Sequence, residues 1–285
     1  MDNQFQNFEL KQQMNKHANM EIELLLEAVY RLSGFDFRQY NQSSISRRIY
    51  NRMRVNNIPT ISRVLEKVIH EEDFLEQLLN DFSINVTEMF RNPSFFKAFR
   101  KEVVPYLKQY PEIRIWHAGC ATGEEVYSMA ILLQEEGLID RAVIYATDMN
   151  EHVLEKAKRG AFSIKKMQAY TTNYMLAGGS HAFSEYYKTD YQYAYFHPEL
   201  LKNIIFAQHN LVTDQSFNEF HVIICRNVLI YFSPVLQSQV HHLFYESLSP
   251  NGFLCLGDKE TLRCEAIISN YKETVAIEKI YQKLD

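Results

Sequence analysis

The sequence lacks cysteine pairs, long apolar runs and a basic excess, and each absence excludes a class of protein. Its cysteines, at positions 120, 225, 255 and 264, form neither a C-x-x-C pair nor a spacing with paired histidines. Neither a zinc site nor a disulfide framework is therefore indicated, and reduced thiols are expected. The sequence contains no run of 18 apolar residues, so no membrane span is predicted, and its N-terminus lacks the apolar core of a signal peptide. The net charge of −5 argues against a general nucleic-acid binder. We expect a cytoplasmic monomer without metal, nucleic-acid binding or membrane insertion.

The phosphate-binding glycine pattern of dinucleotide enzymes is also missing. The central stretch, Ile113 to Leu133, predicts a strand, a turn and an amphipathic helix. Its turn reads G-x-x-x-G, with Gly119 and Gly123, where a dinucleotide fold needs G-x-G-x-x-G. The acids Glu124 and Glu125 follow at the helix start and would repel a phosphate. They suit a ligand that carries an ammonium or sulfonium group, of which S-adenosylmethionine is one.

A second acid fits the same kind of ligand. Ala142 to Ala146 reads as a buried strand that ends in Thr147 and Asp148. An acid about 20 to 30 residues after the glycine turn is placed to bind ribose hydroxyls. The alternative is that Asp148 only caps the helix expected from Asn150 to Lys158.

Four collinear stretches between Asn85 and Phe232 carry a resemblance to a known family: NVTEMFRNPSFF, WHAGCATGEEVYSMA, ATDMNEHVLEKAKRGAF and CRNVLIYF. They resemble the CheR family of S-adenosylmethionine-dependent protein-glutamate methyltransferases, which modify chemotaxis receptors. The resemblance implies an α/β fold, namely a doubly wound, Rossmann-like class I methyltransferase domain with a small inserted antiparallel β-subdomain and an N-terminal all-α domain. The expected ranges are 1–82 for the helical domain, 83–285 for the methyltransferase domain and 162–206 for the insert.

Periodicity supports that division. Helices are predicted at 21–33, 44–54, 61–70 and 72–82, and strands at 204–208, 222–225 and 253–256, with 274–282 closing the sheet. A turn at 250–252 should precede the strand at 253–256. The segment 162–206 is rich in Tyr and Phe and alternates around Gly178-Gly179, which predicts a short antiparallel sheet. Some family members bind a receptor's C-terminal peptide there, whereas an ordinary lid would pack its aromatic residues inward.

The predicted helix at 44–54 is basic. Ile45, Ile49 and Met53 share one face, and arginines occupy the rest. In the family this helix is implicated in docking the acidic helices of the receptor, so Arg48 and Arg52, one turn apart, are the candidate substrate-binding residues. A merely solvated basic face is the alternative.

The resemblance also assigns the cofactor pocket. It implies contacts to S-adenosylmethionine, or to the product S-adenosylhomocysteine, from ten residues: Asn85, Thr87, Arg91, Gly119, Glu124, Asp148, Asn210, Leu211, Arg226 and Asn227. Arg91 suits the methionine carboxylate, and Asn210 and Leu211 border the adenine. From the residues alone, Thr87 as a helix cap and Arg91 as a surface residue would be the favoured interpretation.

The chemistry expected is methyl transfer to a glutamate carboxylate, which is ionised at neutral pH and needs no general base. The sequence offers no Ser/His/Asp or Cys/His arrangement, and His117 at the glycine turn has no evident acidic partner. Tyr231 and Arg226 are the candidates for orienting the acceptor, with a core aromatic role as the alternative for Tyr231. The partner would be a methyl-accepting chemotaxis receptor or a related signalling protein. Two other functions are considered: a cofactor-binding regulatory or scaffold module without turnover, and a methyltransferase for RNA or a small carboxylic acid. The acidic net charge and the absence of an N-P-P-Y type motif disfavour RNA as the substrate.

Overall fold

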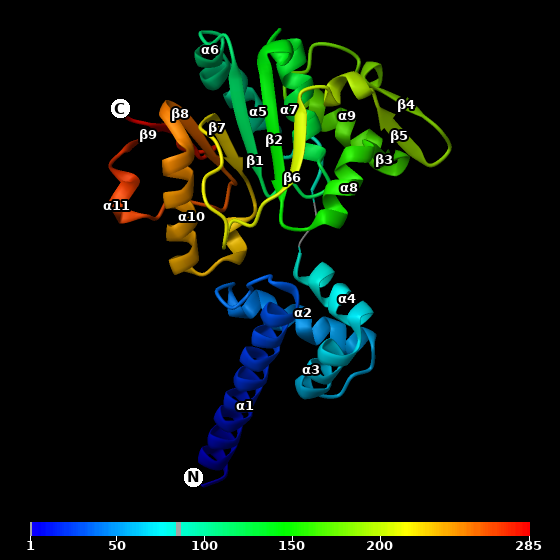
Figure 1. Ribbon diagram of the computed structural model, residues 1–285, viewed down its shortest axis with the longest axis vertical. Helices are drawn as coiled ribbons and strands as arrows, with labels where there is room; N and C mark the ends of the chain where they lie inside the picture. Colours follow the sequence, from blue (N-terminus) through cyan, green and yellow to red (C-terminus); the bar gives the residue numbers. More distant parts are fainter. Residues whose placement is uncertain (1, 84–86) are drawn as a thin grey trace. The chain divides into compact units, whose positions relative to one another are not determined.

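The computed structural model describes residues 2–83 and 87–285, with side chains from residue 17 onward (Figure 1). The chain divides into two compact units. One comprises Met1–Ile84 with Tyr231–Leu236, and the other comprises Asn85–Ile230 with Gln237–Asp285. The predicted fold class is confirmed: a helical N-terminal unit accompanies an α/β unit with a small additional antiparallel sheet.

The helical unit is built from α1 (Asp2–Ser33), α2 (Gln42–Val55), α3 (Ile61–His70) and α4 (Glu72–Phe82). Side-chain caps start two of these helices, because Asn41 accepts a hydrogen bond from the Ser43 N–H and Thr60 accepts one from the Arg63 N–H. Apolar residues at helical spacing, such as Ile45 and Ile49, are buried. Prediction placed the start of α1 at residue 21, but the helix begins at residue 2.

Residues Tyr231–Leu236, beyond the end of β7 (Phe220–Cys225), form part of the helical unit. Tyr40 and Phe232 form an isolated antiparallel bridge, and their rings lie 4.9 Å apart. The Asn41 N–H donates to the Tyr231 carbonyl at 2.7 Å. The unit is therefore discontinuous in sequence, which the periodicity of residues 1–82 could not indicate.

The α/β unit is organised around a seven-stranded sheet with the order β6-β2-β1-β7-β8-β10-β9. The strands are β1 (Ile113–Ala118), β2 (Ala142–Asp148), β6 (Ile204–Gln208), β7, β8 (Leu248–Leu256), β9 (Tyr271–Val275) and β10 (Ile280–Lys283). The first five in spatial order run parallel, and β10 pairs antiparallel with β8 and β9. Two predictions are corrected: residues 250–252 lie inside β8, and residues 274–282 belong to the β9–β10 hairpin.

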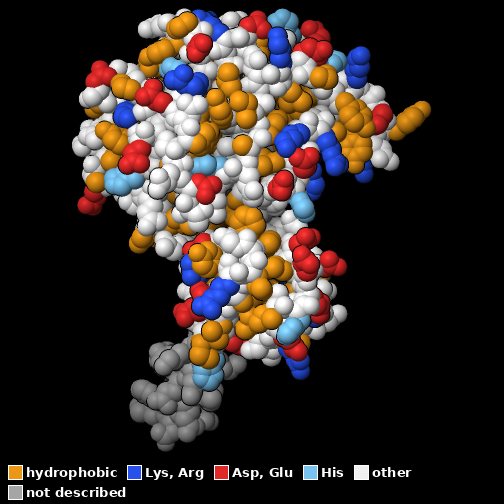
Figure 2. Space-filling view, in the orientation of Figure 1, with side chains coloured by type: hydrophobic (Ala, Val, Ile, Leu, Met, Phe, Trp, Pro, Cys, Tyr) orange, Lys and Arg blue, Asp and Glu red, His pale blue; other side chains and the backbone are white. Residues whose placement is uncertain are grey.

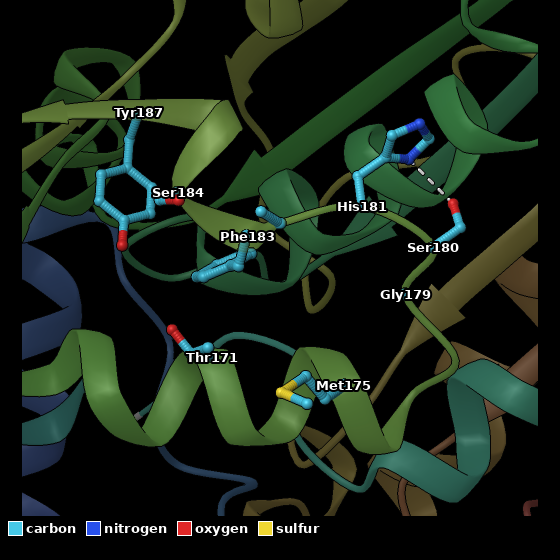
Figure 3. Close-up of a pocket in the computed structure, with 9 residues that line it drawn as sticks. Thr171, Met175, Gly179, Ser180, His181, Phe183, Ser184 and Tyr187 are labelled. Carbon is cyan, nitrogen blue, oxygen red and sulfur yellow. Dashed lines mark hydrogen bonds between the residues drawn. The ribbon is translucent and has the colours of Figure 1, made fainter.

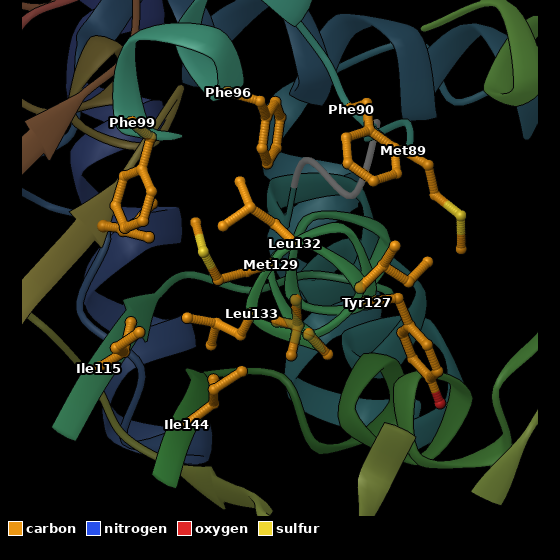
Figure 4. Packing of buried hydrophobic residues seen from close by; sticks show 14 of the residues in the cluster. Met89, Phe90, Phe96, Phe99, Ile115, Tyr127, Met129, Leu132, Leu133 and Ile144 are labelled. Atoms are coloured by element: carbon orange, nitrogen blue, oxygen red, sulfur yellow. The ribbon is translucent and has the colours of Figure 1, made fainter. Parts of the chain in front are cut away.

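Helices cover both faces of this sheet. α7 (Glu124–Glu135) packs its middle residues Met129, Leu132 and Leu133 close to Ile115 of β1 and Ile144 of β2 (Figure 4). On the other face, Trp116 of β1 meets Phe244 of α10 (Pro234–Ser247) at 5.5 Å. Burial on both faces explains why β7 is buried along its whole length. The other helices of this unit are α5 (Pro93–Ala98), α6 (Val104–Leu107), α8 (Glu151–Arg159), α9 (Met167–Leu176) and α11 (Glu265–Ile268), together with the π-helical turn η1 (Phe99–Val103).

The insert contains α9 and the sheet β3-β5-β4, formed by β3 (Ala161–Ser163), β4 (Tyr187–Thr189) and β5 (Tyr193–Phe196). The β4–β5 turn is held by Asp190, whose carboxylate accepts the N–H groups of Gln192 and Tyr193 at 2.7 Å. Gly178-Gly179 follows α9 instead of forming this turn, which corrects the prediction. Phe183 and Phe196 are buried, whereas Tyr191, Tyr193 and Tyr195 are exposed.

Candidate active site

The carboxyl ends of β1, β2, β6 and β7 meet at one edge of the sheet, and the glycine turn after β1 lies there. Gly119 adopts φ +78°, and a Cβ at this position would lie 2.6 Å from the Val228 side chain. Gly123, at φ +92°, is the N-cap of α7, and a Cβ there would lie 2.9 Å from the Ala157 side chain. Both positions require glycine, because left-handed backbone and close contact exclude a side chain.

Asp148 ends β2 and is nearly buried, with 9% of its surface exposed. Its Oδ2 accepts the Ala121 N–H at 2.9 Å, and its Oδ1 accepts the Asn150 N–H at 3.0 Å. Burial raises the pKa of Asp148, while these N–H donors act in the opposite direction. The capping alternative is excluded, because Asn150 is the N-cap of α8 and accepts the His152 N–H. Asp148 is thus fixed against the glycine turn, and each of its carboxylate oxygens can accept a second hydrogen bond.

The acids at the start of α7 point in different directions. Glu124 is 2% exposed and accepts hydrogen bonds from Thr122 Oγ1 at 2.5 Å and from the Tyr170 hydroxyl at 3.3 Å. Its contacts therefore connect α7 to α9. Glu125 instead reaches Arg226 Nη1 at 2.6 Å, and its carboxylate lies 3.4 Å from His117 Nδ1. Glu125, and not Glu124, is the acid at the carboxyl edge of β1 and β7.

The neighbours of Glu125 leave it charged. Although burial opposes ionisation, Arg226 and His117 lower the pKa of Glu125 to about 2. His117 thus has the acidic partner that the sequence did not reveal. The partner is eight residues away along the chain, and only the turn brings the two side chains together.

Arg226 is occupied by protein groups. Its guanidinium also donates to Asn92 Oδ1 at 2.9 Å and lies 4.1 Å above the Phe95 ring, and its side chain is only 2% exposed. These contacts join the end of β7 to α5 and α7. The sequence suggested a direct contact from Arg226 to an acceptor. Such a contact would require Arg226 to give up one of these contacts within the protein.

The segment preceding α5 is held in strained backbone. Phe90 and Asn92 have positive φ, at 51° and 55°, as does Ala121 in the glycine turn, at 49°. Phe90 is fully buried, and its N–H donates to Ser128 Oγ at 2.8 Å. A bulky residue with positive φ is rare, and such outliers concentrate at functional sites.

Two cofactor candidates on this segment remain available. Thr87 and Arg91 are half-buried. Within the described residues, neither side chain has a hydrogen-bond or ion-pair partner, although the Arg91 carbonyl accepts from Arg226. Asn85 falls outside the described residues.

The loops after β6 and β7 carry the remaining cofactor candidates. Asn210 is 9% exposed; its N–H donates to Asp214, and its side-chain oxygen accepts the Val212 N–H. Leu211 beside it is half-buried. Asn227 has φ +62°, and its N–H donates to Glu260 at 2.8 Å. Each residue therefore stands just beyond the carboxyl end of its strand, where ligands of such sheets bind.

The two candidate substrate-docking arginines lie in the helical unit and differ from expectation. Arg52 makes a bidentate pair with Asp81 at 2.6 and 2.8 Å, and its side chain is 15% exposed. Arg48 donates to the Asp81 carbonyl at 2.6 Å and lies 5.8 Å from the Tyr231 ring. The exposed face of α2 is formed instead by Arg47, Tyr50, Asn51 and Arg54. Asp81 of α4 holds Arg52 inward, whereas Arg48 still lines the groove on this face, so a docking role for these arginines stays a prediction.

A groove of about 580 Å³ runs along this face of α2. It is lined by Arg47, Arg48, Tyr50, Asn51, Arg54 and Asp81. Another cavity, of about 470 Å³, lies between α9 and the loop at 179–184, where Ser180 Oγ and His181 Nδ1 are 2.9 Å apart (Figure 3). On the face shown in Figure 2, acidic and basic side chains are interspersed and no extended field of one sign forms.

Within residues 2–83 and 87–285, no cluster of His, Cys, Asp or Glu is arranged to hold a metal ion. The same residues contain no helix long and apolar enough to cross a bilayer. The sheet edge brings together the fixed carboxylate of Asp148 and the glycine turn.

Comparison with known sequences shows the family of the chain. Residues 85–277 match the family model described as CheR methyltransferase, SAM binding domain, and residues 20–83 match CheR methyltransferase, all-alpha domain. The chain belongs to the CheR methyltransferase family. The cofactor is accordingly S-adenosylmethionine, and its demethylated product is S-adenosylhomocysteine.

Named relatives extend over most of the chain. A Pseudomonas putida protein called "Putative methyltransferase Cher3" is 47% identical over 268 residues, covering 94% of this chain and 98% of that protein. The "Chemotaxis protein methyltransferase" of Listeria monocytogenes is 30% identical, covering 80% of this chain and 85% of its own. The protein of the same name from Salmonella typhimurium is 26% identical, covering 83% and 82%.

The residues at the sheet edge fit this cofactor. Ribose hydroxyls need an acceptor, and Asp148 presents oriented oxygens. A methionine carboxylate needs a cation, and Arg91 has an unpaired guanidinium among the described residues. A cofactor without phosphate also explains why two acids, and not a glycine-rich N–H cradle, begin α7.

Proposed function

We propose that this CheR-family methyltransferase transfers methyl groups to glutamate side-chain carboxylates on the cytoplasmic helices of a chemotaxis receptor or a related signalling protein. The names of its relatives support a role in chemotaxis. The observation that carries the choice of acceptor is the absence, at the described sheet edge, of a nucleophile paired with a general base. A carboxylate is ionised at neutral pH and needs neither.

On the cofactor side, each residue has a distinct task. S-adenosylmethionine supplies an electrophilic methyl group on its sulfonium. We assign the ribose hydroxyls to Asp148 and the methionine carboxylate to Arg91, with Thr87 and Asn85 beside it. Glu125 replaces Glu124 as the acid for the ammonium group, because Glu124 is buried against α9. Gly119 gives close access, while Asn210 and Leu211 border the adenine.

On the acceptor side, Tyr231 is the proposed orienting group. It follows Asn227 by four residues, in the short helical turn η6 (Leu229–Tyr231). Its hydroxyl would hold the glutamate in line for attack, so that catalysis arises from positioning. Arg226 acts one step away: through Glu125 and Asn92 it fixes the loop that carries Asn227.

Docking of the acceptor is assigned to the exposed face of α2. Arg47 and Arg54 lie seven residues apart, or about two helical turns, with Tyr50 and Asn51 between them. This spacing matches acids one heptad apart on a partner helix. Arg48 lines the same groove, whereas Arg52 stabilises the unit through Asp81.

The test is methyl transfer to purified receptor cytoplasmic fragments, with the site located by peptide mass spectrometry. We expect added methyl groups on glutamates, and no transfer to fragments in which those glutamates are replaced by alanine. Methylation at lysine, at arginine or on nucleic acid would refute the proposed acceptor. A wild-type protein that binds S-adenosylhomocysteine but labels no acidic fragment would favour the binding module.

A further inference from the structure

A buried carboxylate organises the loop after β7. Glu260 is 4% exposed and lies in the G-D-K-E segment that follows β8. Its Oε1 accepts three successive N–H groups, those of Val228, Leu229 and Ile230, at 2.9, 2.7 and 3.3 Å. Its Oε2 accepts the N–H groups of Asn227 at 2.8 Å and Gly257 at 2.6 Å.

The backbone is shaped for this carboxylate. Asn227 turns into the left-handed region, so that the N–H groups after it converge on one point. A Cβ at Gly257 would lie 2.6 Å from Glu260 Oε2 and 2.8 Å from the Asn227 nitrogen. Converging N–H groups form an anion site, and here a side chain of the protein fills it.

The loop that Glu260 holds carries Asn227, one of the candidate cofactor-binding residues. The loop begins directly after Arg226 and leads into Tyr231. Without the carboxylate, four consecutive N–H groups would lose their acceptor, and buried N–H groups without an acceptor are strongly disfavoured. The loop would then have to refold or admit water, and Asn227 would move with it.

We propose that Glu260 is a positioning residue that holds the loop 227–230, and with it Asn227, in the geometry for methyl transfer. This inference rests on the proposed function for its catalytic readout only. Its structural content is independent: the carboxylate fixes these amide groups whether or not the protein turns over.

Glu135 provides a matched control for a role in stability alone. It is also a buried carboxylate with several donors, among them Arg100, Tyr174, the Ser180 N–H at 2.9 Å and the Tyr186 hydroxyl at 3.1 Å. It ends α7, the helix that Glu124 begins, so about 16 Å of helix separates it from the sheet edge.

The experiment compares Glu260→Gln, Gly257→Ala and Glu135→Gln in the full chain. Glutamine keeps the shape but presents one NH₂ group, so at least two backbone N–H groups lose their acceptor whichever way the amide turns. We expect amide hydrogen exchange at 227–230 to become about tenfold faster or more in Glu260→Gln. We expect kcat to fall about 10- to 100-fold, because small displacements in an active site have effects of that size.

Gly257→Ala should reproduce both effects from the opposite side of the contact. Glu135→Gln should lower Tm while leaving kcat and the exchange at 227–230 unchanged. Unchanged exchange at 227–230 in Glu260→Gln would overturn the inference, and so would a kcat loss no larger than that of Glu135→Gln at an equal loss of Tm. If the wild type methylates nothing, the proposed function fails, while the exchange data still decide whether Glu260 holds the loop.

Discussion

Replacing Asp148 by alanine should weaken cofactor binding, and the structure sets the size of the effect. The carboxylate is nearly buried and held by two backbone N–H groups, so it is already oriented when the ribose arrives. Losing a hydrogen bond to a charged group costs about 1.5 to 3 kcal/mol, or roughly a 10- to 150-fold increase in Kd. Isothermal titration calorimetry with S-adenosylhomocysteine measures this without any turnover.

The same substitution also frees the Ala121 and Asn150 N–H groups, so stability must be measured beside affinity. Asp190→Ala is the matched control, because Asp190 likewise accepts two backbone N–H groups, but in the β4–β5 turn. We expect Asp190→Ala to retain wild-type affinity. A folded Asp148→Ala protein with wild-type Kd and only a lower Tm would refute the ribose assignment.

Three further outcomes are expected. Tyr231→Phe should keep S-adenosylhomocysteine affinity and Tm but lower kcat and kcat/KM together, by a factor equivalent to about 1 to 3 kcal/mol, in single-turnover assays; normal kcat with reduced Tm would make it a core aromatic residue. Arg47→Glu with Arg54→Glu should raise KM for an acidic receptor fragment, with a difference that shrinks as salt screens charges beyond about 8 Å, whereas Arg52→Gln should mainly lower Tm; a KM unchanged across salt would remove α2 from docking. Burial lowers the pKa of His241 to about 4 from the ordinary 6.5. The unfolded chain therefore binds a proton first, and the free energy of unfolding should decrease as pH falls from about 6.5 to 4. When the free energy of unfolding is measured by urea titration at several pH values, it should depend less steeply on pH in His241→Leu than in the wild type over that window. An identical pH dependence would contradict the assignment.

The sequence predicted the parallel core well, because its strands are short apolar runs. β6 was located to the residue, and α3 and α4 were as well, since their apolar spacing is regular. The β9–β10 hairpin was missed, because its exposed edge strand carries no clear alternation. The length of α1 was missed for a related reason, since its first half has no regular apolar stripe.

The site was harder to predict in detail. Glu124 and Glu125 are adjacent acids at a helix start, and only the packing of α9 decides which of them faces the sheet edge. Arg52 looked exposed on a helical projection, but Asp81, 29 residues away, holds it. Glu260 carried no recognisable signal, because converging backbone N–H groups become visible only when β7 and β8 lie side by side.

Ester formation on glutamate is tested most directly by transferring tritiated methyl from S-adenosylmethionine to an acidic receptor fragment and then treating the product with mild base. We expect protein-bound label that depends on Asp148 and is released as volatile methanol, because carboxylate esters hydrolyse in base. Label that survives base, or wild-type protein that transfers none, would contradict the account.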